Sequence, residues 1–252
     1  MYVASLSQYQ TPSVASSAVA AISWFHKIHN LPDPGTNFYV KRALKGIQPY
    51  QSSKVELSPL DRNLLHAILR LLPQVIADNY TSIMLKALFL TMYHACLRAG
   101  EAVVSGHSKH SLHIRNVTVH TGEKPSVTFK LLSSKTSKKE KVFTMLSDPQ
   151  SEFCPVDAMF AYLRQRPNKD GLLFLDYLGE PVPRTFLAEN LKKLIARTGN
   201  NPDRFNTHSF RSGRATDLAK AGVPEAIIKE TGRWSSDAYL KYVRFAAFAL
   251  PR

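Results

Sequence analysis

The sequence predicts a mainly α-helical protein with one small antiparallel β-sheet, an α+β fold. Two observations support this prediction. Over most of the chain, apolar residues recur at the spacing of an amphipathic helix. Three consecutive short segments instead alternate between apolar and polar residues, which is typical of half-buried strands: residues 113–119, 126–132 and 141–146. Because hydrophobic residues make up 44% of the 252 residues, the chain can bury a substantial core.

The first 47 residues are predicted to be helical. Thr11 followed by Pro12 is typical of a helix cap with proline in the first turn, and apolar residues then recur at helical spacing. A shorter basic helix is expected from Phe38 to Leu44. The stretch that follows is polar and lacks a clear period, so we place a linker at residues 48–57.

A second and larger domain is predicted from residue 58 to residue 252. Ser58, Pro59 and Asp61 resemble the start of a capped helix, and a long apolar helix is expected from about Ser82 to Leu97. After the strand segments, helical spacing returns, with glycines where helices are expected to end. The helices expected there span residues 156–165, 184–197, 207–221, 224–230 and 236–243, and the glycines are Gly199, Gly222 and Gly232.

The charge of the chain indicates a polyanionic partner. Lys and Arg number 33 against 19 Asp and Glu, which gives a net charge of +14 and a pI near 9.8. Such a charge repels itself unless an anion relieves it, and nucleic acid is the partner that it favours. The longest apolar run, Ile83 to Leu97, is interrupted by Lys86 and His94, so no membrane partner is expected.

The cysteines and histidines raise the question of a disulfide or a metal site. Cys96 and Cys154 lie in apolar surroundings, so we expect no disulfide and an intracellular, reducing location. His120 to Pro125 reads HTGEKP, like the linker between successive zinc fingers. A finger needs four ligands, and only two could be supplied here. We therefore expect a turn between two strands, and neither a metal nor another cofactor.

A candidate anion site lies near the C-terminus. His208 and Arg211 stand three apart in HSFR, and residues three apart project from the same face of a helix. If Thr207 caps this helix, both side chains lie in its first turn, where unpaired backbone amides add positive potential. Such a site suits a phosphate group.

Together with other segments, this pair resembles the active site of the tyrosine recombinase, or phage-integrase-like, family. Arg98 in LRAGE and Glu101 match the first arginine box, and HSFR matches the second. Trp234 in GRW matches the His/Trp position, and Tyr242 in YVR matches the nucleophile. The resemblance covers residues 58–244. Its wording, HSFR, GRWSSDAY and YVR, is closest to recombinases of eukaryotic mobile elements such as DIRS-type retrotransposons and Cryptons.

The resemblance implies a site-specific recombinase or integrase that breaks and rejoins DNA strands through a 3′-phosphotyrosyl intermediate, without metal or ATP. It implies a catalytic domain at residues 58–252 and, at residues 1–47, a partial helical core-binding region that clamps DNA. The partner is then double-stranded DNA, on which copies of the chain self-associate as a dimer or tetramer. For a eukaryotic chain, the implied location is the nucleus.

The resemblance also gives each site residue a role. Arg98 and Arg211 bind the nonbridging phosphate oxygens, because guanidinium groups make paired, charge-assisted hydrogen bonds to them. His208 is the base or proton shuttle for Tyr242, whose phenol is a weak nucleophile at neutral pH. Glu101 is expected to be a structural partner and not a catalyst.

Two of these assignments have close rivals. In the family, a lysine on a β-hairpin protonates the leaving 5′ oxygen. We choose Lys135, because SSKTSKKE joins two strand segments, and Lys138 and Lys139 are the alternatives. Tyr239 lies three residues before Tyr242 and shares its helical face, but YVR is the better match to the nucleophile segment.

The chain departs from the family near its C-terminus, and one rival function of another class stays open. The residue at the Trp234 position supports the site through packing and its indole donor. The spacing from Trp234 to Tyr242 is one residue shorter than the family's commonest arrangement.

The rival function is that of a non-catalytic DNA-binding protein, either a domesticated recombinase or a helix-turn-helix regulator, because residues 215–234 imitate a helix-turn-helix. This rival explains the charge but not the distant Arg98.

Overall fold

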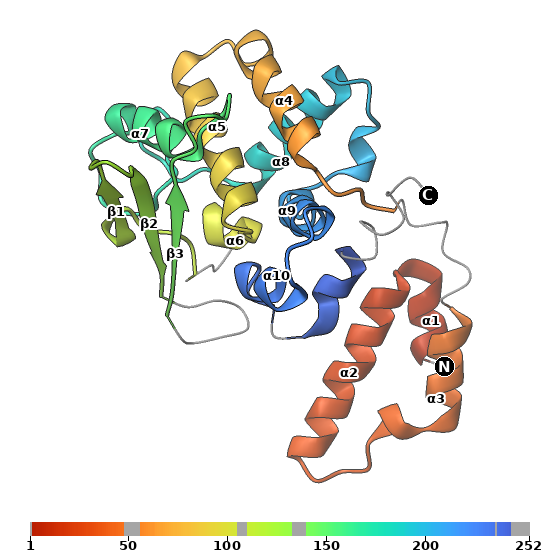
Figure 1. Cartoon of the computed structure of the whole chain (residues 1–252). Coiled ribbons are helices and arrows are strands. Elements are labelled where there is room, and N and C mark those ends of the chain that lie inside the picture. The colour runs from red at the N-terminus through yellow and green to blue at the C-terminus, as the bar shows by residue number, and fades with distance from the viewer. Residues whose placement is uncertain (1, 48–55, 105–109, 133–139, 235, 243–252) are drawn as a thin grey trace. The chain divides into compact units, whose positions relative to one another are not determined.

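The structure, a computed structural model, describes residues 2–47, 56–104, 110–132, 140–234 and 236–242 (Figure 1). Contacts within the chain separate two compact units, Met1–Glu56 and Leu57–Arg252. The boundary, between residues 56 and 57, lies at the end of the linker predicted at residues 48–57, most of which is outside the described residues.

In its described residues, the first unit contains three helices. They are α1 (Tyr2–Tyr9), α2 (Pro12–Ile28) and α3 (Phe38–Gly46), with a short 3-10 turn, η1 (Pro34–Thr36), before α3. α2 begins as predicted, because the Thr11 hydroxyl accepts a hydrogen bond from the Val14 amide at 3.4 Å. The helix at Phe38 is also confirmed, whereas the sequence patterns did not predict α1.

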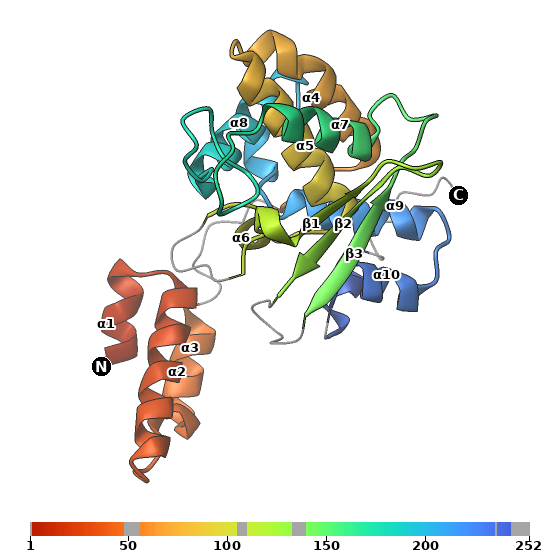
Figure 2. The ribbon, with the colours of Figure 1, turned by 90° about the vertical axis from the view of Figure 1, so that its left-hand side faces the viewer.

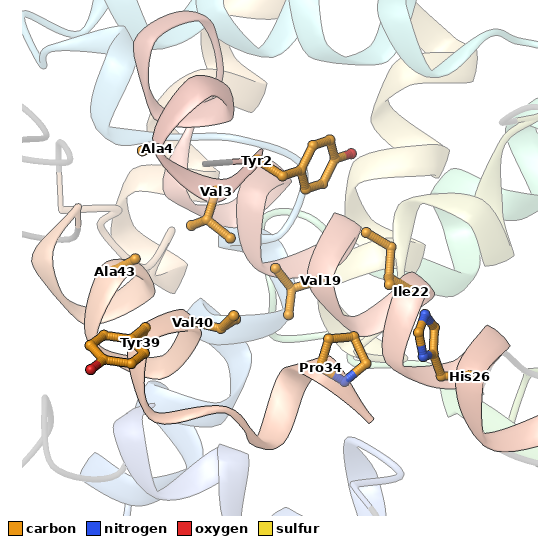
Figure 3. Close-up of a pocket in the computed structure, with 10 residues that line it drawn as sticks. All are labelled: Tyr2, Val3, Ala4, Val19, Ile22, His26, Pro34, Tyr39, Val40 and Ala43. Atoms are coloured by element: carbon orange, nitrogen blue, oxygen red, sulfur yellow. The ribbon is translucent and has the colours of Figure 1, made fainter. Parts of the chain in front are cut away.

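These three helices enclose little core. Within the described part of this unit, the buried apolar residues are Val3, Ala15 and Val19. A hollow of about 500 Å³ lies between the helices, and Figure 3 shows Val19 and Val40 on its wall. Large apolar side chains such as Trp24 remain exposed. The unit therefore depends on few buried contacts for its stability.

The second unit is built around one buried helix. Its helical elements are α4 (Arg62–Val75), α5 (Asn79–His94), α6 (Ala99–Ala102), η2 (Ile114–Asn116), α7 (Pro155–Gln165), α8 (Arg184–Arg197), η3 (Pro202–Arg204), α9 (Ser209–Lys220), α10 (Glu225–Thr231) and η4 (Asp237–Tyr239). Helix α5 is buried over most of its surface, and α4, α7 and α9 pack against it (Figure 1). Across the described ranges, no helix combines the length and apolar character needed to cross a membrane.

A three-stranded antiparallel sheet completes this unit (Figure 2). Its order is β1 (Val117–His120), β2 (Ser126–Leu131) and β3 (Lys141–Leu146). Val127 in the middle strand pairs with Val119 on one side and with Met145 on the other. Val127, Phe129 and Leu131 alternate along β2 and are buried, so this strand turns one face to the core. The predicted fold class is therefore confirmed.

The first strand is shorter than predicted. Residues 114–116 form η2, because the Ile114 amide donates to the Gly171 carbonyl at 3.0 Å and His113 bridges to Leu172, so this stretch pairs away from β2. The HTGEKP segment connects β1 to β2, as predicted for a turn. Among the described residues, no three His, Cys, Asp or Glu side chains gather as metal ligands would.

Two helices begin directly after an aspartate that caps them, and their first residues differ from the predicted starts. Helix α4 begins beyond Ser58, because the Asp61 carboxylate accepts a hydrogen bond from the Leu64 amide at 2.9 Å. Helix α5 begins before the predicted Ser82, because Asp78 caps it in the same way. Aspartate is among the strongest N-cap residues, so these caps outweigh the periodicity of the residues that follow.

Helix α9 packs closely against the segment that precedes α4. The Leu60 amide donates to the Ser209 carbonyl at 3.0 Å. Gly213 approaches the Leu60 carbonyl so closely that a methyl group on its Cα would overlap the oxygen. On another side, α9 contacts α10, with Ala215 and Ile228 in a small apolar cluster separate from the main core. These contacts fix the position of α9 and of the residues at its start.

Replacing Gly213 with alanine should destabilise the second unit, because the added methyl group would push α9 away from Leu60. We expect a loss of about 3 kcal/mol in the free energy of unfolding, at the upper end for overpacking, measured by urea unfolding. Gly122→Ala is the control, since no other atom lies within 4 Å of its added methyl group. Equal stability of the two variants would contradict this packing.

Candidate active site

The site forms where helices α5 and α10 end. Cys96 follows α5 with a φ of +47°, and Arg233 follows α10 with a φ of +55°. In both helices the amide of the next residue donates back into the last turn, at 3.0 Å. This is the Schellman ending, in which glycine is the usual left-handed residue. Another residue costs roughly 1 kcal/mol in that conformation, so both positions carry backbone strain.

Gly232 follows the last residue of α10 as its C-cap, as expected, and the left-handed residue is Arg233, one position later. Gly232 has a further role, because a methyl group there would overlap the indole ring of Trp234. The absence of a side chain at Gly232 thus lets Trp234 fold back over the end of the helix.

The carbonyl oxygens at these helix ends bind two buried arginines. Arg211, from α9, donates to the carbonyls of Cys96, at 3.1 Å, and of Gly232. Arg233 donates to the carbonyls of Ala95 at 2.9 Å and Cys96 at 3.2 Å. A helix C-terminus carries unpaired carbonyls and partial negative charge, which suits a guanidinium group. The Cys96 carbonyl therefore joins α9 and α10 to the end of α5.

Arg211 is the buried cation of the site. It is only 1% exposed, and the Trp234 ring covers its guanidinium at 4.4 Å. Burial, and then the charges of Arg98 and Arg233, lower the pKa of Arg211 to about 10. Arg211 is therefore still a cation at neutral pH. Two of its five N–H donors bind these carbonyls.

Arg98 lies at the start of α6, beside Glu101. The Glu101 carboxylate accepts hydrogen bonds from Arg98 Nη1 at 2.8 Å and from the Arg98 amide at 2.9 Å. Its second oxygen also accepts from Arg233 Nη2 at 2.9 Å. Burial acts to raise the pKa of Glu101, but the Arg233 charge and the Arg98 hydrogen bonds outweigh it, so the net pKa is below its ordinary value. Glu101 is thus an ionised bridge between two arginines.

The side chains of His208 and Tyr242 contact each other. The Nε2 atom of His208 and the Tyr242 hydroxyl are 2.5 Å apart. Desolvation of the imidazole, and then the charges of Arg211 and Arg98, lower the pKa of His208. Burial raises the pKa of Tyr242, and the Arg211 charge opposes that rise. At neutral pH these shifts favour a neutral imidazole beside a protonated phenol.

Tyr239 points elsewhere. Its hydroxyl donates to the Glu225 carboxylate at 3.1 Å, and the residue is buried in the small apolar cluster with Ile228 of α10. Burial, and then this hydrogen bond, raise the pKa of Tyr239. Of the two rival tyrosines, Tyr242 is therefore the one beside His208.

The start of α9 differs from the prediction that Thr207 caps it. The Asn206 side chain accepts a hydrogen bond from the His208 amide at 2.7 Å, so the chain turns before α9 begins at Ser209. His208 occupies the cap position, and Arg211 lies in the first turn. Of the two side chains expected in the first turn, Arg211 lies there and His208 lies just before it.

The structure thus brings together five of the six predicted site residues: Arg98, His208, Arg211, Trp234 and Tyr242. The sixth, Lys135, and its alternatives Lys138 and Lys139 lie outside the described residues. They belong to the connection between β2 and β3, which do pair as neighbours.

Arg233 is the site residue that the sequence reasoning missed. Trp234 was matched to the His/Trp position although its distance from Tyr242 is one residue short. The family's commonest spacing, counted back from Tyr242, ends at Arg233. That discrepancy was the available signal that the residue before the tryptophan also belongs to the site.

Comparisons with known proteins agree with this geometry. The sequence profile of the Phage integrase family matches residues 62–245, most of the chain. No curated protein sequence matches the chain.

Several solved structures share the fold. The XerH site-specific recombinase in a post-cleavage complex with a palindromic difH substrate has a TM-score of 0.67 and 17% identity, over 98% of this chain and 68% of that one. The lambda integrase dimer bound to a core site has a TM-score of 0.63 and 12% identity, over 96% and 62%. The Tn1549 transposon integrase with circular intermediate DNA has a TM-score of 0.59 and 13% identity, over 96% and 78%.

This chain spans only 63% of the XerH chain in its pre-cleavage complex. At such low identities, the likeness to solved structures establishes the fold alone. The family rests on the sequence profile, which covers nearly the whole second unit. The chain belongs to the phage integrase family.

Proposed function

We propose that this chain is the catalytic part of a tyrosine recombinase, which breaks and rejoins double-stranded DNA through a 3′-phosphotyrosyl intermediate. The observation that carries the proposal is the contact of 2.5 Å between the Tyr242 hydroxyl and His208 Nε2, beside two arginines. A nucleophile, a neutral base and an anion site are the parts that transesterification at a phosphodiester needs.

In the proposed cleavage step, Tyr242 Oη attacks the phosphorus and forms a P–O bond, while the bond to the 5′ oxygen breaks. The phenolic proton passes to His208 Nε2. Arg98 and Arg211 stabilise the charge on the nonbridging oxygens by charge-assisted hydrogen bonds. A lysine, Lys135 in our assignment, gives its proton to the leaving 5′ oxygen. Rejoining reverses these transfers, so the covalent intermediate conserves the bond and needs neither ATP nor metal.

The proposed partner is double-stranded DNA. The net charge of +14 supports it, because neutralised phosphates release counterions and relieve the self-repulsion of the protein. The structural relatives XerH and the Tn1549 integrase were solved on DNA, and the lambda integrase as a dimer on a core site. These likenesses support binding of residues 1–47 to DNA as a clamp and self-association of the chain there as a dimer or tetramer.

We place the chain among recombinases of eukaryotic mobile elements. The wording HSFR, GRWSSDAY and YVR supports the kinship with DIRS-type and Crypton enzymes, and one structural relative is a transposon integrase. An enzyme of this kind acts on chromosomal DNA, so its proposed location is the nucleus.

Cleavage of a nicked suicide substrate should produce a covalent protein–DNA adduct that Tyr242→Phe abolishes, because the variant lacks the attacking oxygen. Tyr239→Phe is the matched control and should retain the adduct. Denaturing gel electrophoresis measures both. An adduct that survives in Tyr242→Phe and disappears in Tyr239→Phe would refute the assignment, and DNA binding without any adduct would favour the non-catalytic alternative.

The imidazole of His208 should titrate below its ordinary pKa of 6.5 in the free protein, because desolvation and two arginine charges oppose protonation. NMR of the ring protons measures this. Arg98→Gln should shift the pKa of His208 upward. Arg62→Gln is the control, because its charge acts on His94 instead. A pKa of His208 at or above 6.5 in the unaltered protein would contradict its role as a neutral base.

Lys135→Ala should lose adduct formation by about a hundredfold on ordinary DNA, the usual scale for a general acid. A substrate with sulfur at the 5′ bridging position should restore it, because a thiolate leaves without protonation. Lys138→Ala and Lys139→Ala should cleave both substrates at the original rate. If one of these variants shows the loss and rescue in place of Lys135→Ala, that lysine is the acid.

A further inference from the structure

We propose that Arg233 is a positioning residue: by occupying one oxygen of Glu101, it keeps Arg98 from closing onto that carboxylate and leaves the Arg98 guanidinium available to the scissile phosphate. This inference rests on the proposed function and adds a residue to it.

The contacts at Glu101 show how the carboxylate is shared. Its Oε1 accepts from Arg98 Nη1 at 2.8 Å, and its Oε2 accepts from Arg233 Nη2 at 2.9 Å. The side chain of Glu101 is 3% exposed and that of Arg233 is 7% exposed, whereas Arg98 is 27% exposed. Of these two arginines, Arg98 is therefore the more accessible to a phosphate.

Arg233 is anchored from several directions. Besides Glu101, it donates to the carbonyls of Ala95 and Cys96, and its guanidinium lies 5.3 Å from the ring centre of Phe143 on β3. Its left-handed backbone places this side chain at the end of α10, pointing back to the end of α5. A strained conformation held by surrounding contacts is typical of a functional position.

Loss of Arg233 would remove one of the two hydrogen bonds to Oε2 of Glu101, which also accepts from the Arg98 amide at 2.9 Å. Arginine and carboxylate prefer a bidentate pair, with two parallel hydrogen bonds. Arg98 already bonds Oε1 with one nitrogen, so it could turn to bond both oxygens. That turn would draw its charge toward Glu101 and away from His208, whose pKa it lowers. The titration of His208 therefore reports the position of Arg98 without any DNA.

A double-mutant cycle on the full chain tests the inference. His208 is titrated by NMR in the free protein, in Arg233→Met, in Arg98→Gln and in the double variant. We expect Arg233→Met to shift the pKa of His208 upward in the presence of Arg98 and to leave it unchanged in the Arg98→Gln background, because the effect passes through Arg98. Equal shifts in both backgrounds, or no shift in either, would overturn the proposal.

Two further variants separate positioning from general damage. Arg233→Lys retains a cation for Glu101 Oε2 and the same backbone strain, so it should shift the pKa of His208 less than Arg233→Met does. If Arg233→Met does not fold, the cycle is run with Arg233→Gln, which also lacks the positive charge. Arg166→Met is the matched control, because Arg166 also binds backbone carbonyls but lies in another part of the unit. It should leave the pKa of His208 unchanged, and an equal shift in it would count against positioning.

Activity gives a second, separate readout. With nicked DNA, Arg233→Met should slow adduct formation by at least about tenfold. It should change DNA affinity by less than about threefold, because Arg98, which Arg233 positions, acts on the reacting phosphate and not on the duplex as a whole. An unchanged rate of adduct formation would overturn the proposal. If the unaltered chain forms no adduct, the proposed function fails, while the titration cycle in free protein still decides the role of Arg233.

Discussion

A single buried carboxylate, Glu101, holds two guanidinium groups inside the second unit, and the geometry of the site depends on this shared ion pair. Removing charges from water is expensive unless each has partners. Arg98 and Arg233 divide the oxygens of Glu101 between them. Arg211 has no carboxylate partner within the described ranges and is held by the carbonyls of Cys96 and Gly232. Three arginines thus face one carboxylate, and the excess positive charge suits a phosphate.

The arginines of the site are held by the ends of helices. Because helices α5 and α10 both finish in a left-handed residue, their last carbonyls turn toward α9 and its arginine. Trp234 folds over Arg211 only because Gly232 leaves room for the indole. Gly213 in turn lets α9 approach Leu60. A shift of any of these helices would move the carbonyls, and with them the cations that the chemistry requires.

Sequence patterns predicted the elements well where periodicity and local chemistry agreed. The bounds of α8 and β3 match the prediction, and the pairing of β2 with β3 follows from their alternation. The cap of α9 was wrong, because the Asn206 side chain turns the chain before the helix and leaves His208, not Thr207, at the cap position. Arg233 was missed because the next residue, Trp234, already matched the His/Trp position. Their spacing of three residues predicts that Tyr239 and Tyr242 share a helical face. In the folded chain, however, the Tyr239 hydroxyl contacts Glu225 and the Tyr242 hydroxyl contacts His208.

The most direct test of the account is to find the residue that carries DNA. After reaction with a suicide substrate, trypsin cleaves behind Arg233, Lys241 and Arg244, so Tyr239 falls in the peptide of residues 234–241 and Tyr242 in that of residues 242–244. Nuclease trimming followed by mass spectrometry then identifies the modified peptide. We expect a nucleotide on residues 242–244. A nucleotide on residues 234–241, or on any other peptide, would contradict it.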